Sequence, residues 1–308
     1  MSRAVVFAYH NVGVRCLSVL LAHGVDVALV VTHQDNPNET IWFDSVAGLA
    51  ALHEIPCITP DDPNESTVTA RINELQPDFI FSFYYRLMLK PALLNLARRG
   101  AYNMHGSLLP KYRGRVPVNW AVLHGERETG ATLHRMLEKP DAGALLVQQA
   151  VPILADDSAF EVFQKVTVAA EMALDRVLPA LLAGSAEERQ QDLSQGSYFG
   201  GRKAEDGRID WQQSAQAIHN LVRAVAPPYP GAFCDTPHGR LRVLKTLLPK
   251  HPQASRSADS GLYSEHNKLL AICGDGSVLQ LITAELDGTA LDAASFATGF
   301  GRQKLSLS

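Results

Sequence analysis

The sequence predicts an α/β protein of two domains: a larger one with a mostly parallel sheet and helices on both faces, and a smaller, mainly β one. Three observations carry this prediction. Short apolar, β-branched runs alternate with helical patterns through the first half of the chain, as in parallel sheets. Residues 184–201 are rich in Gly, Ser, Gln and Glu and have no apolar period, which is typical of a linker. Beyond the linker, strand-like runs follow one another closely.

In the first half, three apolar runs are too short for helices and predict buried strands. They cover residues 4–9, 27–32 and 78–83. The helix after the first run ends at Gly24, a natural C-cap position. Further helical patterns cover residues 45–54 and 66–75, so that strands and helices alternate along the chain.

Two more helices complete the first domain. Pro91 opens a short helix that we expect to end at Gly100. Residues 158–182 form the clearest helix, with a capping box at the start and one apolar stripe. Pro179 is expected to kink or shorten its last turn. We therefore expect a first domain over residues 1–188, a linker over 189–204 and a second domain over 205–308.

The second domain has one helical pattern, at residues 214–225, followed by a rigid Pro-rich turn at 226–231. Short strand-like runs follow. They cover residues 240–244, 268–273 and 278–283. Asp275 and Gly276 stand between the last two runs and are a strong hairpin signal. This succession of short strand-like runs predicts a small, mainly β domain of barrel-like form.

Composition limits the class of protein. The 308 residues suffice for two domains, and 46% hydrophobic with 19% charged residues is ordinary for a soluble globular protein. A net charge of −4 gives no general attraction to nucleic acid or anionic membranes, so we expect neither partner. Four cysteines without a CxxC pair argue against a zinc site or a disulfide framework. No apolar stretch approaches the ~20 residues needed to span a bilayer, so a cytoplasmic protein is expected. From the cysteine pattern we also expect no metal.

The common motifs of α/β enzymes are missing from the first domain. The turn after the first strand, residues 9–13, has no GxGxxG sequence for a dinucleotide. There is also no Walker A sequence, no GxSxG elbow and no HExxH. In an open α/β sheet the site still belongs at the carboxyl ends of the strands, and we look for chemistry there.

Three polar residues at such positions could carry chemistry. Asn103 and His105 stand two apart in a strand-like segment, so their side chains point to one side of it. An amide can donate to an oxyanion, and an imidazole titrates near neutral pH. Asp141 lies in a turn marked by Pro140 and Gly143 and could assist the histidine. Taken singly, each residue is better explained as satisfying backbone groups.

Together, these residues and their neighbours resemble a family signature. Asn103, His105 and Ser107 are followed by Leu-Leu-Pro, then by Arg-Gly at 113–114, and later by Asp141. This combination is similar to that of the 10-formyltetrahydrofolate-dependent formyltransferases. The resemblance covers nearly the whole chain. It implies a Rossmann-like first domain, an open β-barrel of OB type as the second, 10-formyltetrahydrofolate as co-substrate, and Asn103, His105 and Asp141 as catalytic residues.

The flanking segments separate the branches of this family. Residues 7–10, 81–86 and 132–136 look like those of the bifunctional polymyxin-resistance formyltransferases. That branch implies UDP-4-amino-4-deoxy-L-arabinose as acceptor, a role in lipid A modification, and a separate or fused decarboxylase. The segment after the second strand lacks the basic run that a tRNA acceptor needs. Another amino sugar, methionyl-tRNA, or a non-catalytic folate or nucleotide-sugar binding module remain as alternatives.

The resemblance also implies residues that bind the two substrates. The donor side would include Leu87, Met88, Leu89, Arg115, Leu137, Glu138, Lys139, Pro140 and Asp141. The acceptor side would include Ser107, Arg223 and Tyr229. From the sequence alone, residues 87–89 could equally be core, and the turn that contains Tyr229 needs no functional explanation. We interpret His10, His33 and His134 as ordinary satisfied or exposed histidines.

Overall fold

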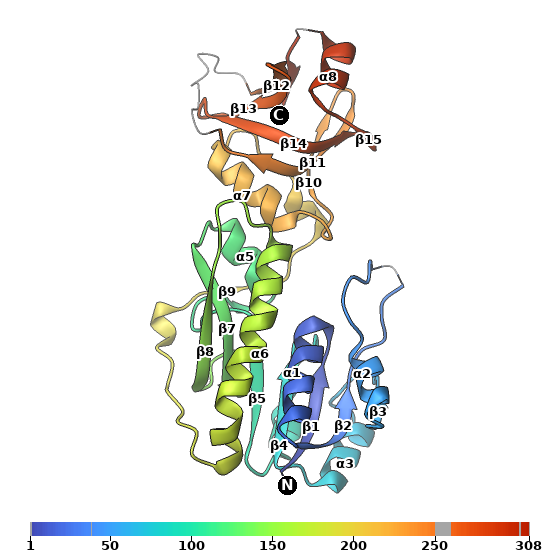
Figure 1. The fold of residues 1–308 in the computed structure, drawn as a ribbon, viewed down its shortest axis with the longest axis vertical. Coiled ribbons are helices and arrows are strands. Elements are labelled where there is room, and N and C mark those ends of the chain that lie inside the picture. The colour runs from blue at the N-terminus through green and yellow to red at the C-terminus, as the bar shows by residue number, and fades with distance from the viewer. Residues whose placement is uncertain (1, 38, 250–259, 302, 308) are drawn as a thin grey trace. The chain divides into compact units, whose positions relative to one another are not determined.

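The computed structural model describes residues 2–37, 39–249, 260–301 and 303–307 (Figure 1). The chain forms two compact units. Unit 1 consists of Met1–Pro117, Glu128–Pro152 and Phe163–Gly200, and unit 2 of Val118–Arg127, Ile153–Val162 and Gly201–Ser308. Two short segments that precede residue 188 thus belong to unit 2, and the domain limits expected at 188 and 204 remain predictions.

Unit 1 is built on a seven-stranded sheet with the order β3-β2-β1-β4-β5-β7-β8. The strands are β1 (Arg3–Ala8), β2 (Asp26–Val31), β3 (Cys57–Ile58), β4 (Phe79–Phe83), β5 (Gly100–His105), β7 (Glu128–Arg135) and β8 (Leu145–Pro152). The first five pair in parallel, whereas β7 runs antiparallel to both β5 and β8. The three strands predicted from apolar runs are confirmed, because such runs are buried on both faces of a parallel sheet.

Helices cover both faces of this sheet, as predicted (Figure 1). They are α1 (His10–Ala22), α2 (Val46–Leu52), α3 (Ser66–Leu75), α4 (Pro91–Leu94) and the greater part of α6 (Ala159–Ala183). Val5 and Phe7 of β1 share one apolar cluster with Ile72 of α3. Ala8 points to the other face, where Gly13 of α1 comes so close that an added Cβ would lie 3.2 Å from the Ala8 Cβ.

The expected end of one of these helices was wrong. α4 ends at Leu94, well before Gly100, and the guanidinium of Arg99 instead donates to the carbonyls of Leu181 and Leu182 at the end of α6, at 3.0 and 2.8 Å. An arginine in this position satisfies carbonyls that have no partner within the helix. Pro179 does not shorten α6, which continues to Ala183.

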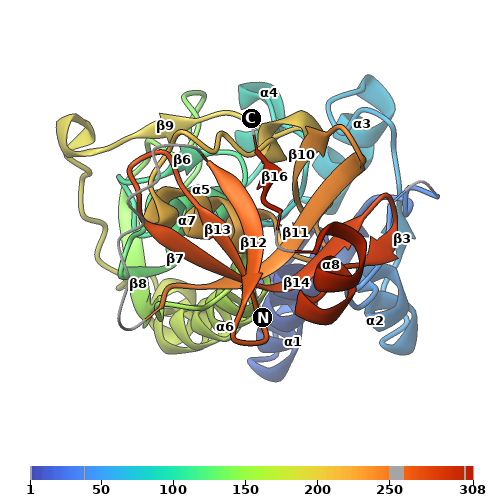
Figure 2. The ribbon, with the colours of Figure 1, turned by 90° about the horizontal axis from the view of Figure 1, so that it is seen from above.

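Unit 2 contains an antiparallel sheet with the order β10-β11-β14-β13-β12-β16, and β15 is added at β14. Figure 2 labels the six strands of this order. Its strands are β10 (Ala232–Thr236), β11 (Gly239–Leu247), β12 (Gly261–Glu265), β13 (Lys268–Ile272), β14 (Val278–Leu286), β15 (Thr289–Ala290) and β16 (Leu305–Ser306). The sheet, with helices α7 (Ala215–Val225) and α8 (Ala293–Phe300), encloses a core in which Trp211 and Phe296 are fully buried. The predicted hairpin at Asp275 and Gly276 joins β13 to β14, and the smaller, mainly β domain is confirmed.

Helix α7 also binds the two early segments of unit 2 through buried polar contacts. The Asn119 amide donates to the carbonyl of Ala224 at 2.8 Å, in the segment that contains α5 (Pro117–Leu123). His219 Nε2 lies 3.1 Å from the carbonyl of Ala155, and Arg223 Nη1 donates to that of Asp157 at 2.9 Å. The first segment directly precedes β7 and the second directly follows β8. The two chain segments that flank the β7–β8 hairpin in sequence therefore belong to unit 2.

Two short strands, β6 (Arg113–Gly114) and β9 (Tyr198–Phe199), pair in parallel in unit 1. Single-turn 3₁₀ helices lie at Leu193–Gln195 and Ala204–Gly207. Within the described parts of the chain, none of the helices combines the length and apolar character that a bilayer crossing requires.

Candidate active site

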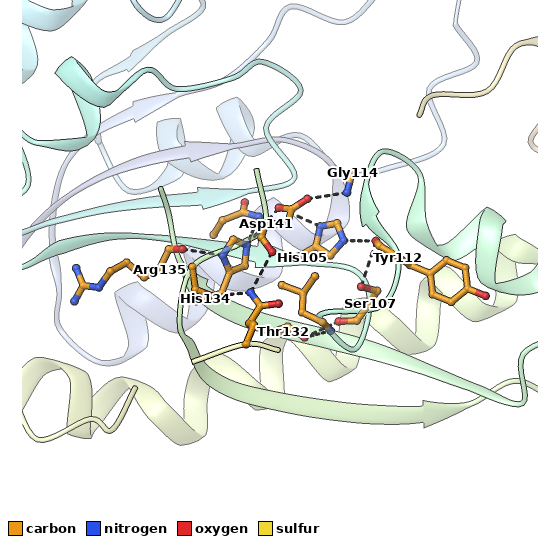
Figure 3. A network of polar contacts seen from close by, with 12 residues as sticks. His105, Ser107, Tyr112, Gly114, Thr132, His134, Arg135 and Asp141 are labelled. Atoms are coloured by element: carbon orange, nitrogen blue, oxygen red, sulfur yellow. Dashed lines mark hydrogen bonds and ion pairs between the residues drawn. The ribbon is translucent and has the colours of Figure 1, made fainter. Parts of the chain in front are cut away.

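Strand β5 carries Asn103 and His105 on one face of the sheet, at the point where strand direction changes from parallel to antiparallel. In the register between β5 and β7, Asn103 faces His134 and His105 faces Thr132. The Asn103 amide nitrogen lies 3.1 Å from His134 Nε2. The end of β5 and the facing part of β7 thus bring an amide and two imidazoles together. Figure 3 shows the two imidazoles, those of His105 and His134.

Asp141 approaches this face from the loop that follows β7. Its Oδ2 accepts a hydrogen bond from the backbone N–H of Gly114 at 2.8 Å. Its Oδ1 lies 3.7 Å from His105 Nδ1 and 3.4 Å from His134 Nε2 (Figure 3). The structure therefore brings Asp141, which is distant in sequence from Asn103 and His105, into one cluster with them, and His134 links Asp141 to Asn103.

The environment of Asp141 keeps its carboxyl ionised. Burial alone would raise the pKa, but the charge attraction of His105 and the hydrogen bond from the Gly114 N–H hold the pKa of Asp141 well below its usual range. The side chain is only 12% exposed, so water screens these interactions weakly. A largely buried, ionised carboxylate between two imidazoles is suited to stabilise positive charge beside it.

The tautomer of His105 follows from its partners. A carbonyl oxygen can only accept, so His105 Nε2, 2.8 Å from the carbonyl of Tyr112, carries a proton. A second proton on the ring would then lie at Nδ1, the nitrogen that faces Asp141. The loop that supplies the Tyr112 carbonyl is fastened by Thr132, whose hydroxyl donates to the carbonyl of Ser107 at 2.6 Å.

Two family models match the chain. The model for formyl transferase covers residues 15–178, and that for the formyl transferase C-terminal domain covers residues 202–301. This chain belongs to the formyltransferase family. Asn103, His105 and Asp141 all lie within the first match.

Solved structures of other proteins share the fold of this formyltransferase. A structure of WlaRD, a sugar 3N-formyltransferase with dTDP and 5-N-formyl-THF, matches with a TM-score of 0.72 and 19% identity over 91% of this chain and 97% of that one. An N-formyltransferase from Helicobacter canadensis, in complex with folinic acid and dTDP-3-aminofucose, gives 0.71 and 19% over 91% and 99%. HypX from Aquifex aeolicus with tetrahydrofolic acid gives 0.60 and 16%, over 97% of this chain and 47% of that one.

The residues expected on the donor side of this formyltransferase lie in two segments. In the first, Leu87 and Met88 are 40% and 58% exposed, whereas Leu89 is a buried core residue. Asn64 fixes this segment: its amide donates to the Met88 carbonyl at 2.9 Å and accepts from the N–H of Lys90 at 2.7 Å. No sequence pattern indicates this role of Asn64, because it lies in a turn that is distant in sequence from the segment that it binds.

The second segment and Arg115 are also accessible. Leu137 is 49% exposed, and the residues between it and Asp141 are exposed or half-buried. They are Glu138, Lys139 and Pro140. Arg115 is exposed, and its backbone N–H donates to the carbonyl of Phe199 at 3.0 Å. Leu87, Met88 and Leu137 are thus apolar side chains that this formyltransferase leaves in contact with solvent.

The residues expected on the acceptor side are placed differently. Ser107 is fully buried and its hydroxyl donates to the carbonyl of Lys111 at 2.7 Å, so it fastens the loop after β5. Arg223 and Tyr229 belong to unit 2. Arg223 is 6% exposed and donates to the side-chain oxygen of Asn220 at 2.8 Å, in addition to its bond to Asp157.

The histidines interpreted as ordinary divide into two groups. Burial, with the charge of Arg86, lowers the pKa of His10 to about 3 and that of His33 to about 4. Each accepts one backbone N–H at 3.0 Å, His10 from Asn11 and His33 from Arg86, so the interpretation is confirmed for both. His134 is buried and has partners as well, but those partners are Asn103 and Asp141. A single strand does not reveal its neighbour's register, so the sequence could not show this.

Gly143 limits how the loop of Asp141 can be altered. A Cβ at this position would lie 1.9 Å from the backbone carbonyl oxygen of Arg135, which cannot move without breaking the sheet. We expect Gly143→Ala to lower the free energy of unfolding by about 1–3 kcal/mol, measured by chemical denaturation. Gly299→Ala, in helix α8 with no atom within 4 Å of the added Cβ, should be neutral or stabilising. Equal stability of the two variants would contradict this packing argument.

Proposed function

We propose that this formyltransferase moves a formyl group from 10-formyltetrahydrofolate to the amine of a nucleotide-linked amino sugar. The observation that carries the proposal is the cluster in which one buried carboxylate, Asp141, lies between two imidazoles beside the amide of Asn103. Such a set of groups supplies an oxyanion donor and a proton acceptor, the two functions that acyl transfer to an amine requires.

In the proposed reaction, the neutral amine attacks the formyl carbon and a new C–N bond forms. The carbonyl oxygen becomes an oxyanion, which the amide of Asn103 and the protonated His105 stabilise. The amine nitrogen gives up a proton to Asp141, directly or through water. The bond between the formyl carbon and N10 of the folate then breaks, N10 takes a proton, and tetrahydrofolate leaves.

Two observations support 10-formyltetrahydrofolate as the donor of the formyl group. Three apolar side chains, Leu87, Met88 and Leu137, remain exposed in the segments that the family resemblance assigns to the donor, and exposed apolar groups near a site mark a binding surface. The similar structures of WlaRD and of the Helicobacter canadensis enzyme contain 5-N-formyl-THF and folinic acid. We propose that the backbone of residues 87–89 and 137–141, with Arg115, contacts the pterin end.

An amino sugar is the acceptor class that we favour. WlaRD is described with dTDP and the Helicobacter canadensis enzyme with dTDP-3-aminofucose. Within this class, the segments at 7–10, 81–86 and 132–136 resemble the formyltransferase domain of the bifunctional polymyxin-resistance protein ArnA. We therefore propose UDP-4-amino-4-deoxy-L-arabinose as acceptor, in lipid A modification, with Arg223 and Tyr229 on the acceptor side and Ser107 shaping the loop. The four free cysteines support the reducing cytoplasm as its location.

The test is an assay of tetrahydrofolate release from 10-formyltetrahydrofolate, followed spectroscopically. Parallel reactions contain UDP-4-amino-4-deoxy-L-arabinose, dTDP-3-aminofucose, methionyl-tRNA or no acceptor. We expect turnover only with the UDP sugar. Turnover with another acceptor would keep the formyl transfer and overturn the lipid A role. Release without acceptor would indicate a hydrolase, and no release with any acceptor would favour a binding module.

A further inference from the structure

A second histidine, His134, joins the proposed catalytic groups to one another. It lies in β7 directly opposite Asn103 of β5, and it is 1% exposed. In antiparallel strands such opposite side chains lie on the same face and in contact. His134 is therefore held against Asn103 by the register of the sheet, without any flexible segment between them.

The partners of His134 fix its tautomer. Its Nδ1 lies 2.9 Å from the backbone carbonyl oxygen of Arg135, which can only accept, so Nδ1 carries the proton. In the neutral ring, Nε2 then presents a lone pair. That lone pair faces the amide nitrogen of Asn103 at 3.1 Å, which donates to it. The same bond decides which end of the Asn103 amide points to β7.

This orientation matters for the chemistry because an amide nitrogen has two N–H groups. When His134 holds one of them, the direction of the other is fixed. We propose that His134 is a positioning residue, which orients the Asn103 amide so that its second N–H donates to the oxyanion of the tetrahedral intermediate. The inference rests on the proposed formyl transfer, and it assigns His134 a role through Asn103 rather than contact with substrate.

Asp141 restricts the protonation state in which His134 can orient Asn103. Its Oδ1 lies 3.4 Å from the same Nε2 atom of His134 and 3.7 Å from His105 Nδ1. A proton on Nε2 would turn that nitrogen into a donor to the carboxylate, and Asn103 would lose its acceptor. His134 can therefore orient Asn103 only in the form protonated at Nδ1 alone.

Kinetics of paired variants test the role. We expect His134→Phe to lower kcat by about 10- to 100-fold, somewhat less than the about 10²–10³ typical of losing an oxyanion donor outright, with KM for both substrates unchanged. His134→Gln, whose side-chain oxygen can accept from Asn103, should restore most of the rate. Adding His134→Phe to Asn103→Ala should change kcat by no more than about twofold, because nothing is left to orient. Effects that multiply, or a change confined to KM, would overturn the inference.

Two further measurements keep this test separate from that of the function. His23→Gln removes an exposed histidine that pairs with Asp175 at 2.8 Å and serves as the matched control, with unchanged kcat. If the wild-type protein releases no tetrahydrofolate with any acceptor, the proposed function fails first. The inference is then decided by ¹⁵N NMR of the histidine rings: His134 protonated at Nδ1, with an Nε2 signal that shifts in Asn103→Ala, supports it. Protonation at Nε2 would overturn it.

Discussion

Replacing Asp141 with asparagine should lower kcat by about 10²–10⁴, the range typical of removing a general acid or base. Asparagine has nearly the same shape and can still accept from the Gly114 N–H, so the loop should keep its place. What disappears is the charge between His105 and His134. The loss should therefore appear in kcat with little change in KM, measured by tetrahydrofolate release under saturating donor and acceptor.

The exposed pair of Asp175 and His23 supplies the control for this experiment. Asp175→Asn removes the same charge beside a histidine on the surface and should leave kcat unchanged. The pH dependence of stability adds a second readout. The folded pKa of Asp141 is below the unfolded value, so its contribution is present above about pH 4 and is lost as the pH falls. The stability difference between wild type and Asp141→Asn should shrink in acid, and a constant difference would contradict the assigned environment.

His105→Gln should lower kcat by about 10²–10³, the second largest effect that we expect. In the wild-type protein His105 Nε2 lies 2.8 Å from the Tyr112 carbonyl oxygen. The glutamine amide nitrogen can reach the same position and donate the same hydrogen bond. It offers no group at the Nδ1 position, which faces Asp141. A rate close to that of the wild type would mean that His105 only holds its loop, and the proposed mechanism would be wrong.

His105→Asn gives the complementary variant. Its side-chain nitrogen can occupy the Nδ1 position but does not reach the Tyr112 carbonyl, so this variant loses the loop contact that His105→Gln keeps. We expect it to be slow as well, since an amide cannot take the second proton that the mechanism requires. Thermal unfolding of both variants shows whether either has lost the fold rather than the chemistry.

Much of the fold was readable from local patterns. The strands β1, β2 and β4 are continuous apolar runs because both of their faces are covered by helices. Helix α3 was predicted with the bounds that the structure has, Ser66–Leu75. The prediction made helix α4 too long, because the sequence after Leu94 contains no helix-breaking residue before Gly100. In the structure the helix ends at Leu94, and Arg99 contacts the end of α6.

The candidate site was readable only in part. The alternation of side chains in a strand places Asn103 and His105 together, and the family resemblance added Asp141. The roles of His134 and Asn64 could not be predicted, because each contacts a segment that is distant from it in the sequence. Strand register between β5 and β7 depends on the pairing of whole strands, which no short motif encodes.

The contacts of helix α7 bear on how such proteins can diversify. Asn119, Ala155 and Asp157 lie in the first half of the chain or close to its middle, yet their polar groups are satisfied by residues 219–224. A recombination that exchanged everything after residue 200 would remove these partners, at a cost of about 1–3 kcal/mol each. A foreign C-terminal segment would therefore need equivalents of His219 and Arg223 to fold with this N-terminal part.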